Sequence, residues 1–322
     1  MLEKVNIRQK LNARKTEKKQ GISGLIVSDF KINYGIYALA IPGILYYLIF
    51  CYLPMYGVII AFKDYSPSLG ILGSNFVGLK HFMSFFESIY FSRVVSNTII
   101  LNLFLILFSF PAPIILALMI NEIKVGKFSK TVQICTYMPH FISTVVICGM
   151  VIDFTSNNGI ITNLINSLGG NYENLLYHAE LYRAIYVLSD IWQTMGWNSI
   201  VYLAAILSID SELYEAAEID GANKFAQLMH VTIPGILPTI VIMLVLRIGN
   251  IMSVGAEKVI LLYNPVIYEV SDVISSFIYR KGLIESNQSF SAAVGMFNSV
   301  INCVLVFGAN YISKKATNSG LW

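Results

Sequence analysis

Long apolar runs alternate with short polar stretches along the 322 residues of this chain. A helix needs about 20 mainly apolar residues to cross a hydrocarbon core of about 30 Å. Prolines interrupt several of the runs, which membrane helices tolerate because neighbouring helices and polar side chains satisfy the freed carbonyl groups. The pattern predicts six transmembrane helices, at about 35–62, 97–121, 131–154, 183–207, 234–256 and 291–313.

Lysine and arginine are shared unequally between the two sides that six helices would separate. If the N-terminus is inside, the cytoplasmic pieces carry 14 of these residues and the external pieces carry seven. Because cytoplasmic segments are enriched in Lys and Arg, the asymmetry predicts that both termini are cytoplasmic. The cytoplasmic pieces are then a basic N-terminal segment, two loops and a short tail, at 1–34, 122–130, 208–233 and 314–322.

The composition indicates an all-α integral membrane protein. Hydrophobic residues make up 56% of the chain and charged residues only 13%, whereas soluble domains are about 25% charged. The net charge of +3 is concentrated in the basic segment 1–34, which is typical of a contact with anionic lipid rather than with nucleic acid. This segment is too long and polar for a signal peptide, so the mature protein is expected to begin near Met1.

Sequence motifs for bound nucleotides and metals do not occur. The chain contains no GxxxxGK[ST] loop, no HExxH and no CxxC pair. We therefore expect no cofactor, no metal and no catalytic residue in this chain.

A polar stretch separates the fourth and fifth predicted helices. Within 208–233, Asp210 or Ser211 can cap the N-terminus of a short helix, and Gly221 can supply a turn before a second one. Pro234 then begins the next span, where its missing N–H costs nothing. The stretch predicts a compact helix-turn-helix on the cytoplasmic face. A solvated loop is the alternative, although the consecutive alanines of this stretch favour close approach by a partner.

The motifs of this stretch resemble those of a known family. "EAA" at 215–217, "DGA" at 220–222 and "VTIP" at 231–234 are similar to the EAA loop of ABC-importer permeases, whose pattern is EAA, three residues, G, nine residues, I-x-L-P. Two longer stretches, "YLPMYGVIIAFKDYSPSLGILGSNFVGLKHF" and "VGAEKVILLYNPVIYEVSDVISSFIYRKGL", resemble the oligosaccharide branch, akin to maltose-importer permeases. Ala256 departs from the aromatic residue expected there.

The resemblance implies a type I ABC-importer fold over 35–313, with 208–233 as the EAA loop. It implies a second, homologous permease subunit, two ATPase subunits that bind ATP and Mg²⁺, and an extracytoplasmic binding protein that delivers an oligosaccharide. The chain would then be a non-catalytic transport subunit of a bacterial cytoplasmic membrane. The residues implied to couple to the ATPase are Glu215, Ala216, Ala217, Asp220, Gly221 and Ala222.

Polar residues inside predicted membrane helices are candidates for a substrate pathway, because such residues usually face the interior of the bundle. Carboxylate, amide and guanidinium groups match sugar hydroxyls, and indole rings can stack on a pyranose. Arg247 can recognise a carboxylate on an acidic oligosaccharide, or it can pair structurally with Asp190 or Glu257. The other candidates can also pair with one another or with the second permease. The predicted pathway residues are Asp190, Trp192, Gln193, Thr194, Trp197, Arg247, Asn250 and Ser253.

Two other classes of function stay open at this point. An ion-coupled secondary transporter usually shows inverted repeats and several intramembrane carboxylates, and no repeat is visible here. An intramembrane enzyme needs an acid–base or metal cluster, for which only His140, Asp190 and Glu257 are available, without a recognised spacing. A purely structural subunit is a further alternative.

Overall fold

The computed structural model describes residues 29–30, 32–123, 126–317 and 320. Most of the predicted basic segment 1–34 lies outside the described residues. The chain divides into two compact units, Met1–Ile59 and Ile60–Trp322.

The first unit contains most of the first predicted span. Its apolar residues form a continuous helical stretch, Tyr34–Phe62, close to the predicted 35–62. The stretch loosens into a π-helical turn shortly before Pro54, whose ring cannot donate a backbone hydrogen bond. Its parts are α3 Tyr34–Tyr46, the π-helical turn Tyr47–Tyr52, α4 Leu53–Met55 and a 3₁₀ helix Tyr56–Phe62 that enters the second unit.

The second unit begins with a small hairpin and then becomes helical. Strand β1 (Lys63–Asp64) pairs antiparallel with β2 (Asn75–Phe76), and α5 (Gly70–Gly73) lies between them in the sequence. The following elements are α6 Lys80–Phe86, α7 Phe91–Phe104, a π-helical turn Leu105–Ser109, α8 Pro111–Glu122, α9 Lys127–Tyr137, a 3₁₀ helix Met138–Phe141, α10 Thr144–Thr155 and α11 Ile160–Ser167.

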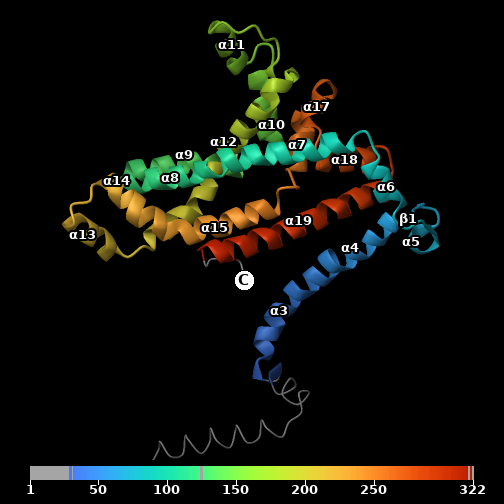
Figure 1. Cartoon of the computed structure of the whole chain (residues 1–322), viewed down its shortest axis with the longest axis horizontal. Coiled ribbons are helices and arrows are strands. Elements are labelled where there is room, and N and C mark those ends of the chain that lie inside the picture. Colours follow the sequence, from blue (N-terminus) through green and yellow to red (C-terminus); the bar gives the residue numbers. More distant parts are fainter. Residues whose placement is uncertain (1–28, 31, 124–125, 318–319, 321–322) are drawn as a thin grey trace, which may run out of the picture. The chain divides into compact units, whose positions relative to one another are not determined.

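The C-terminal half carries the longest helices, and Figure 1 shows α15 and α19 side by side. Gly196 of α12 permits a close approach to α9, because an added Cβ would lie 1.9 Å from the Thr136 carbonyl oxygen. The elements are a 3₁₀ helix Leu175–Tyr177, α12 Ala179–Leu207, α13 Ser211–Ile219, α14 Lys224–Gln227, a π-helical turn Leu228–Thr232, α15 Ile233–Gly249, α16 Ala256–Leu262, a 3₁₀ helix Pro265–Ile267, α17 Tyr268–Ser271, α18 Ile274–Tyr279, a π-helical turn Arg280–Ile284 and α19 Gln288–Thr317.

Five helical stretches in the described part of the chain have both the length and the apolar composition to cross a membrane, one fewer than predicted. The fourth predicted span is present as α12, which has 29 residues but is not among the five. It carries charged and amide side chains along its length, which lower its mean hydropathy. The five are Tyr34–Phe62, Phe91–Glu122, Thr144–Ser167, Lys224–Gly249 and Gln288–Lys315.

The third predicted span, 131–154, is the clearest difference between sequence and structure. Helix α9 ends at Tyr137, and a 3₁₀ turn containing Pro139 follows. Ser143 then caps a new helix, α10, by accepting a hydrogen bond from the Val146 N–H at 3.4 Å. The helix is interrupted because proline removes a donor and serine offers the backbone an alternative acceptor.

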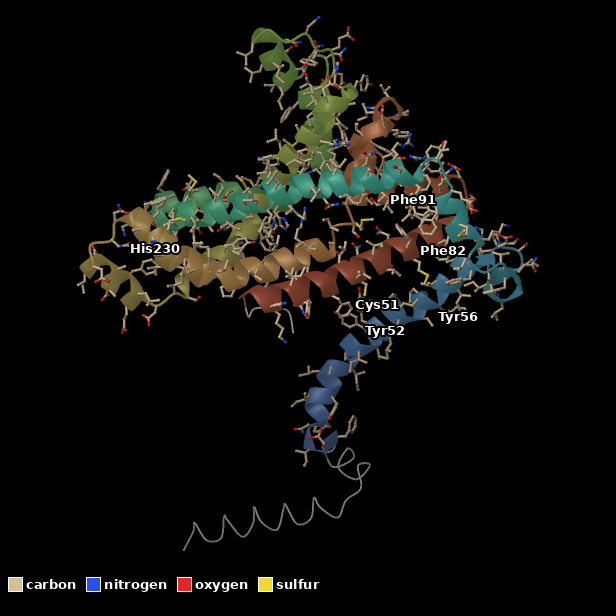
Figure 2. The ribbon with its side chains drawn as sticks, viewed as in Figure 1. Cys51, Tyr52, Tyr56, Phe82, Phe91 and His230 are labelled. Atoms are coloured by element: carbon tan, nitrogen blue, oxygen red, sulfur yellow. The ribbon has the colours of Figure 1, made fainter. Side chains whose placement is uncertain are left out.

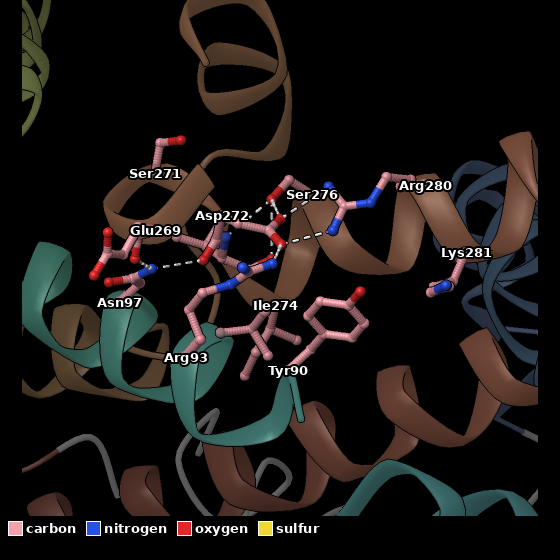
Figure 3. A network of polar contacts seen from close by, with 12 residues as sticks. Tyr90, Arg93, Asn97, Glu269, Ser271, Asp272, Ile274, Ser276, Arg280 and Lys281 are labelled. Atoms are coloured by element: carbon pink, nitrogen blue, oxygen red, sulfur yellow. Dashed lines mark hydrogen bonds and ion pairs between the residues drawn. The ribbon is translucent and has the colours of Figure 1, made fainter. Parts of the chain in front are cut away.

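A buried carboxylate fixes the segment after α16 against α7. Asp272 is completely buried and accepts hydrogen bonds from Nη1 and Nη2 of Arg280, at 3.2 and 2.6 Å, and from Arg93 Nη2 at 3.2 Å (Figure 3). Ser276 Oγ donates to the same carboxylate at 2.9 Å. Asn97 of α7 donates to the Asp272 carbonyl at 3.1 Å. We call these five residues the Asp272 network.

Candidate functional site

A polar cavity of about 730 Å³ lies among α10, α12, α15 and the residues that lead into α16. Six of the eight predicted pathway residues line it. Helical periodicity explains why the α12 residues among them line the same cavity, because residues three and four apart share one face of a helix. The six are Asp190, Gln193, Thr194, Arg247, Asn250 and Ser253.

Asp190 is held from two sides. Ser109 Oγ donates a hydrogen bond to its Oδ2 at 2.5 Å, and Lys258 Nζ lies 4.0 Å from its Oδ1. In the described chain, neither Asp190 nor Glu257 forms an ion pair with Arg247. The cation near Asp190 is thus Lys258 and not Arg247.

Lys258 lies in the first turn of α16 and is buried, although it lines the cavity. Its ammonium group lies 5.2 Å from the centroid of the Tyr186 ring, within the range of a cation–π interaction. Burial lowers the pKa of Lys258 from its usual value, and the negative charge of Asp190 opposes that shift.

The residues after α15 are oriented by α19. Asn302 Nδ2 donates to Ser253 Oγ at 2.8 Å, and Asn302 Oδ1 accepts from the Met252 N–H at 3.0 Å. Asn250 ends α15 and is exposed to the cavity, with its Nδ2 donating only locally to the Leu246 carbonyl at 3.2 Å. In the described chain the Asn250 amide therefore makes no side-chain hydrogen bond to another helix.

The two predicted tryptophans lie elsewhere. Trp192 lines a separate apolar cavity of about 370 Å³ between α10, α11 and α12. Trp197 stacks on His140, with ring centroids 4.7 Å apart and planes 3° apart. Of this pair only His140 lines the polar cavity. The helical spacing of Trp197 suggested a ring for sugar stacking, but the helix break at Pro139 inserts His140 in front of it.

The cavity also contains residues that are not among the eight predicted pathway residues. His140, Tyr186 and Lys258 line it, and Ser109 reaches its Asp190 from the π-helical turn before α8. The signal for Lys258 was its position after Glu257 at the end of a long apolar run. Within the described residues, no group of three or more His, Cys, Asp or Glu side chains is arranged to hold a metal.

The EAA loop, residues 208–233, begins with the predicted short helix. Asp210 is the capping residue of α13, and its carboxylate accepts from the Glu212 N–H at 3.0 Å. Gly221 turns the chain with a φ of 79°, a conformation that favours glycine. Asn223 caps α14 by accepting from the Ala226 N–H at 2.8 Å. Two capped helices joined by a glycine turn form this loop.

The second half of the loop differs from the prediction. Helix α14 does not end before the fifth span but continues through the π-helical turn Leu228–Thr232 into α15. Pro234 therefore lies inside a continuous helical stretch instead of starting it. The wider π-helical turn accommodates the proline, because the ring removes one donor from the regular ladder.

Large apolar side chains of the EAA loop point away from the chain. The exposed fractions are 54% for Leu213, 87% for Ile219 and 70% for Phe225. Figure 2 shows His230, in the last part of this loop, and Phe91, at the start of α7, toward opposite ends of the second unit. The loop therefore presents an apolar surface at one end of the helices. Exposed apolar side chains outside the membrane-spanning stretches are candidates for contact with a partner protein.

Comparisons with known proteins show the family of this chain. Residues 82–318 match the family model described as the inner membrane component of binding-protein-dependent transport systems. Protein LplB of Bacillus subtilis (strain 168) is 43% identical over 304 residues, which cover 94% of this chain and 95% of that protein. The polygalacturonan/rhamnogalacturonan transport system permease protein YteP of the same strain is 40% identical, with 95% of each chain covered.

A solved structure is similar over nearly the whole chain. It is a crystal structure of a bacterial alginate ABC transporter in complex with an alginate pentasaccharide-bound periplasmic protein. The similar chain superposes with a TM-score of 0.84 at 42% identity, covering 91% of this chain and 99% of that one. The match of fold and sequence confirms the fold class and the family that the EAA motif indicated. This chain belongs to the family of inner membrane components of binding-protein-dependent transport systems, the permeases of ABC importers.

Proposed function

We propose that this chain pairs with a second permease subunit to form the pathway of an ATP-driven oligosaccharide importer. The observation that carries the proposal is the polar cavity, in which carboxylate, amide and guanidinium groups from α12 and α15 converge. Such groups match the hydroxyls of a sugar. Two of the similar proteins are named for polysaccharide transport, which supports the same substrate class.

The EAA loop is proposed to dock on an ATPase subunit. Its apolar side chains Leu213, Ile219 and Phe225 are exposed, which supports burial against a partner. Glu215 and Asp220 add exposed charge around them. An extracytoplasmic binding protein is proposed to deliver the sugar at the opposite end of the helices. ATP and Mg²⁺ would be bound by the ATPase subunits alone.

Replacing Asn250 with Ala tests the proposed pathway. Its amide makes one local hydrogen bond in the described chain, so the fold is expected to persist while uptake falls. A lost hydrogen bond to an uncharged ligand is worth about 0.5–1.5 kcal/mol, which corresponds to a loss of up to about tenfold in apparent affinity. The measurement is sugar uptake by the assembled complex, with co-purification of the subunits as control. Unchanged uptake kinetics would remove Asn250 from the pathway.

Accessibility of the two faces tests the proposed orientation. In a variant without native cysteines, cysteine at positions 15 and 218 is expected to react only from the cytoplasmic side with a membrane-impermeant thiol reagent. Cysteine at position 172 is expected to react only from outside, because Lys and Arg favour the cytoplasm. Position 15 lies outside the described residues. External labelling at 218 would exclude docking of an ATPase there.

An ion-coupled secondary transporter is the alternative that the sequence left open, and the family membership of the chain does not favour it. The charged residues of the cavity, Asp190, Arg247, Glu257 and Lys258, resemble the intramembrane charges of such proteins. That mechanism leaves the exposed apolar surface of the EAA loop without a role. ATP dependence of uptake separates the two candidates.

A further inference from the structure

Lys258 presents a buried ammonium group that lacks a hydrogen-bond acceptor among the described residues. Only 6% of its side chain is exposed. An ammonium group has three N–H donors, and a charged group buried without partners is costly. The residue nevertheless lies in the wall of the polar cavity. Lys258 therefore combines a buried ammonium group, unused N–H donors and a place in the wall of the cavity.

Asp190 is too far away to satisfy this donor. Its Oδ1 lies 4.0 Å from Lys258 Nζ, beyond the 2.7–3.2 Å range of N–H···O hydrogen bonds. Its Oδ2 accepts from Ser109 Oγ at 2.5 Å, which holds the carboxylate toward the π-helical turn before α8. Asp190 therefore provides a favourable charge for the ammonium group without occupying its donors.

The cavity brings two cationic side chains, Lys258 and Arg247, together with the carboxylates of Asp190 and Glu257. The Lys258 ammonium nitrogen lies 5.2 Å from the centroid of the Tyr186 ring. The ring stabilises the cation through a cation–π interaction, and it provides no oxygen acceptor for the N–H groups. Arg247 lines the same cavity and forms no ion pair among the described residues. Two cationic side chains with unused donors thus line one polar cavity.

We propose that Lys258 binds the carboxylate of an acidic sugar unit, a hexuronate, and that Ser109 positions Asp190 so that Lys258 stays available. The inference rests on the proposed function, because it specifies the class of oligosaccharide that the pathway takes. The substrate carboxylate becomes the acceptor that Lys258 lacks. Hydrogen bonds between charged groups are short and strong, so the contact discriminates a hexuronate from a neutral hexose.

A purely structural role for Lys258, as the counterion of Asp190, makes a different prediction. In that case Lys258→Met harms the protein by leaving Asp190 without a cation, and acidic and neutral sugars suffer equally. The double variant Lys258→Met/Asp190→Asn removes both charges, so under a structural role it regains binding of both sugars. If Lys258 binds the sugar, the double variant stays selectively deficient for the acidic one.

The test uses the transporter reconstituted with its partner subunits and two sugars. One is a hexuronate tetrasaccharide, and the other is the same tetrasaccharide with its carboxyl groups reduced to hydroxymethyl groups. Direct titration without the binding protein gives dissociation constants for both sugars, and uptake with the binding protein gives KM and kcat. Lys80→Met is the matched control, because Lys80 pairs with Asp64 at 2.8 Å outside the cavity.

Lys258→Met is expected to weaken binding of the hexuronate about tenfold or more, as removal of a hydrogen bond to a charged group does. Binding of the reduced sugar is expected to stay within about twofold, and Lys258→Arg is expected to recover most of the hexuronate binding. Ser109→Ala is expected to weaken hexuronate binding, but less than Lys258→Met does. Without the Ser109 hydroxyl, Asp190 can approach Lys258 and compete with the substrate carboxylate. The control variant should match the wild type.

Three results from the variants, and one from the wild type, overturn the inference. The first is an equal loss of binding for both sugars in Lys258→Met, and the second is unchanged hexuronate binding in that variant. The third is a double variant that regains its selectivity for the hexuronate. A wild-type transporter that takes up only neutral oligosaccharides also contradicts it, while the proposed function stands. A wild-type transporter that takes up no oligosaccharide at all contradicts the proposed function itself.

Discussion

Gly221→Asp is expected to abolish transport while the permease still inserts in the membrane. Gly221 has a φ of 79°, and residues with a Cβ are strained there by about 1–2 kcal/mol. An added Cβ meets nothing within 4 Å in this chain, so a steric effect beyond that strain must come from a partner. Uptake and co-purification of the ATPase with the permease pair measure the two consequences, loss of docking and loss of coupling.

Three companion variants separate the causes. Asn and Asp tolerate a positive φ to a similar degree, so the difference between Gly221→Asn and Gly221→Asp reports the added negative charge. Ala217→Lys places a long charged chain in the loop beside the exposed apolar surface and is expected to be as severe as Gly221→Asp. Glu215→Ala is expected to be mild, because one exposed ion pair is worth about 1 kcal/mol or less. Full uptake and normal co-purification by Gly221→Asp would show that the loop is not the coupling element.

Asp272→Asn is expected to cause the largest loss of stability in the described chain. The substitution keeps the shape of the side chain but leaves Arg93 and Arg280 without their shared carboxylate, at side-chain exposures of 30% and 17%. Breaking a buried ion pair by removing one partner costs about 3–5 kcal/mol. The thermal unfolding midpoint of the purified permease, together with its yield from membranes, measures this effect.

Asp64→Asn provides the matched control for that experiment. Asp64 also pairs with a cation, Lys80 at 2.8 Å, but its side chain is 42% exposed. Exposed ion pairs contribute little because water screens them, so its unfolding midpoint is expected to stay near that of the wild type. An Asp272→Asn variant as stable as the Asp64→Asn variant would show that the Asp272 network does not hold the segment in place.

The helices were predictable from the sequence where one simple pattern decides them. The stretches Phe91–Glu122 and Gln288–Lys315 contain the predicted spans 97–121 and 291–313, because long apolar runs have few alternatives to a helix. The break at Pro139 was not predicted, since proline is common inside membrane helices and only the cap at Ser143 makes it an end. Local chemistry at one residue therefore decides where a long apolar run divides.

The candidate site was predictable only within single helices. Helical spacing places Asp190, Gln193 and Thr194 on one face, and all three line the polar cavity. Lys258 was missed as a cavity residue because the fold, not the spacing, brings it near Asp190. The contact between Arg93 and Asp272 joins residues 179 positions apart. Such tertiary contacts leave no periodic signal in the sequence.

The central claim is that this chain forms the pathway of an ATP-driven, binding-protein-dependent oligosaccharide importer. The most direct measurement is uptake of a labelled oligosaccharide into proteoliposomes that contain this chain, its second permease and the ATPase subunits. The account predicts uptake only with ATP at the ATPase side and sugar-loaded binding protein at the other, and no change when ion gradients are dissipated. Uptake that proceeds without ATP and follows an imposed ion gradient would contradict it.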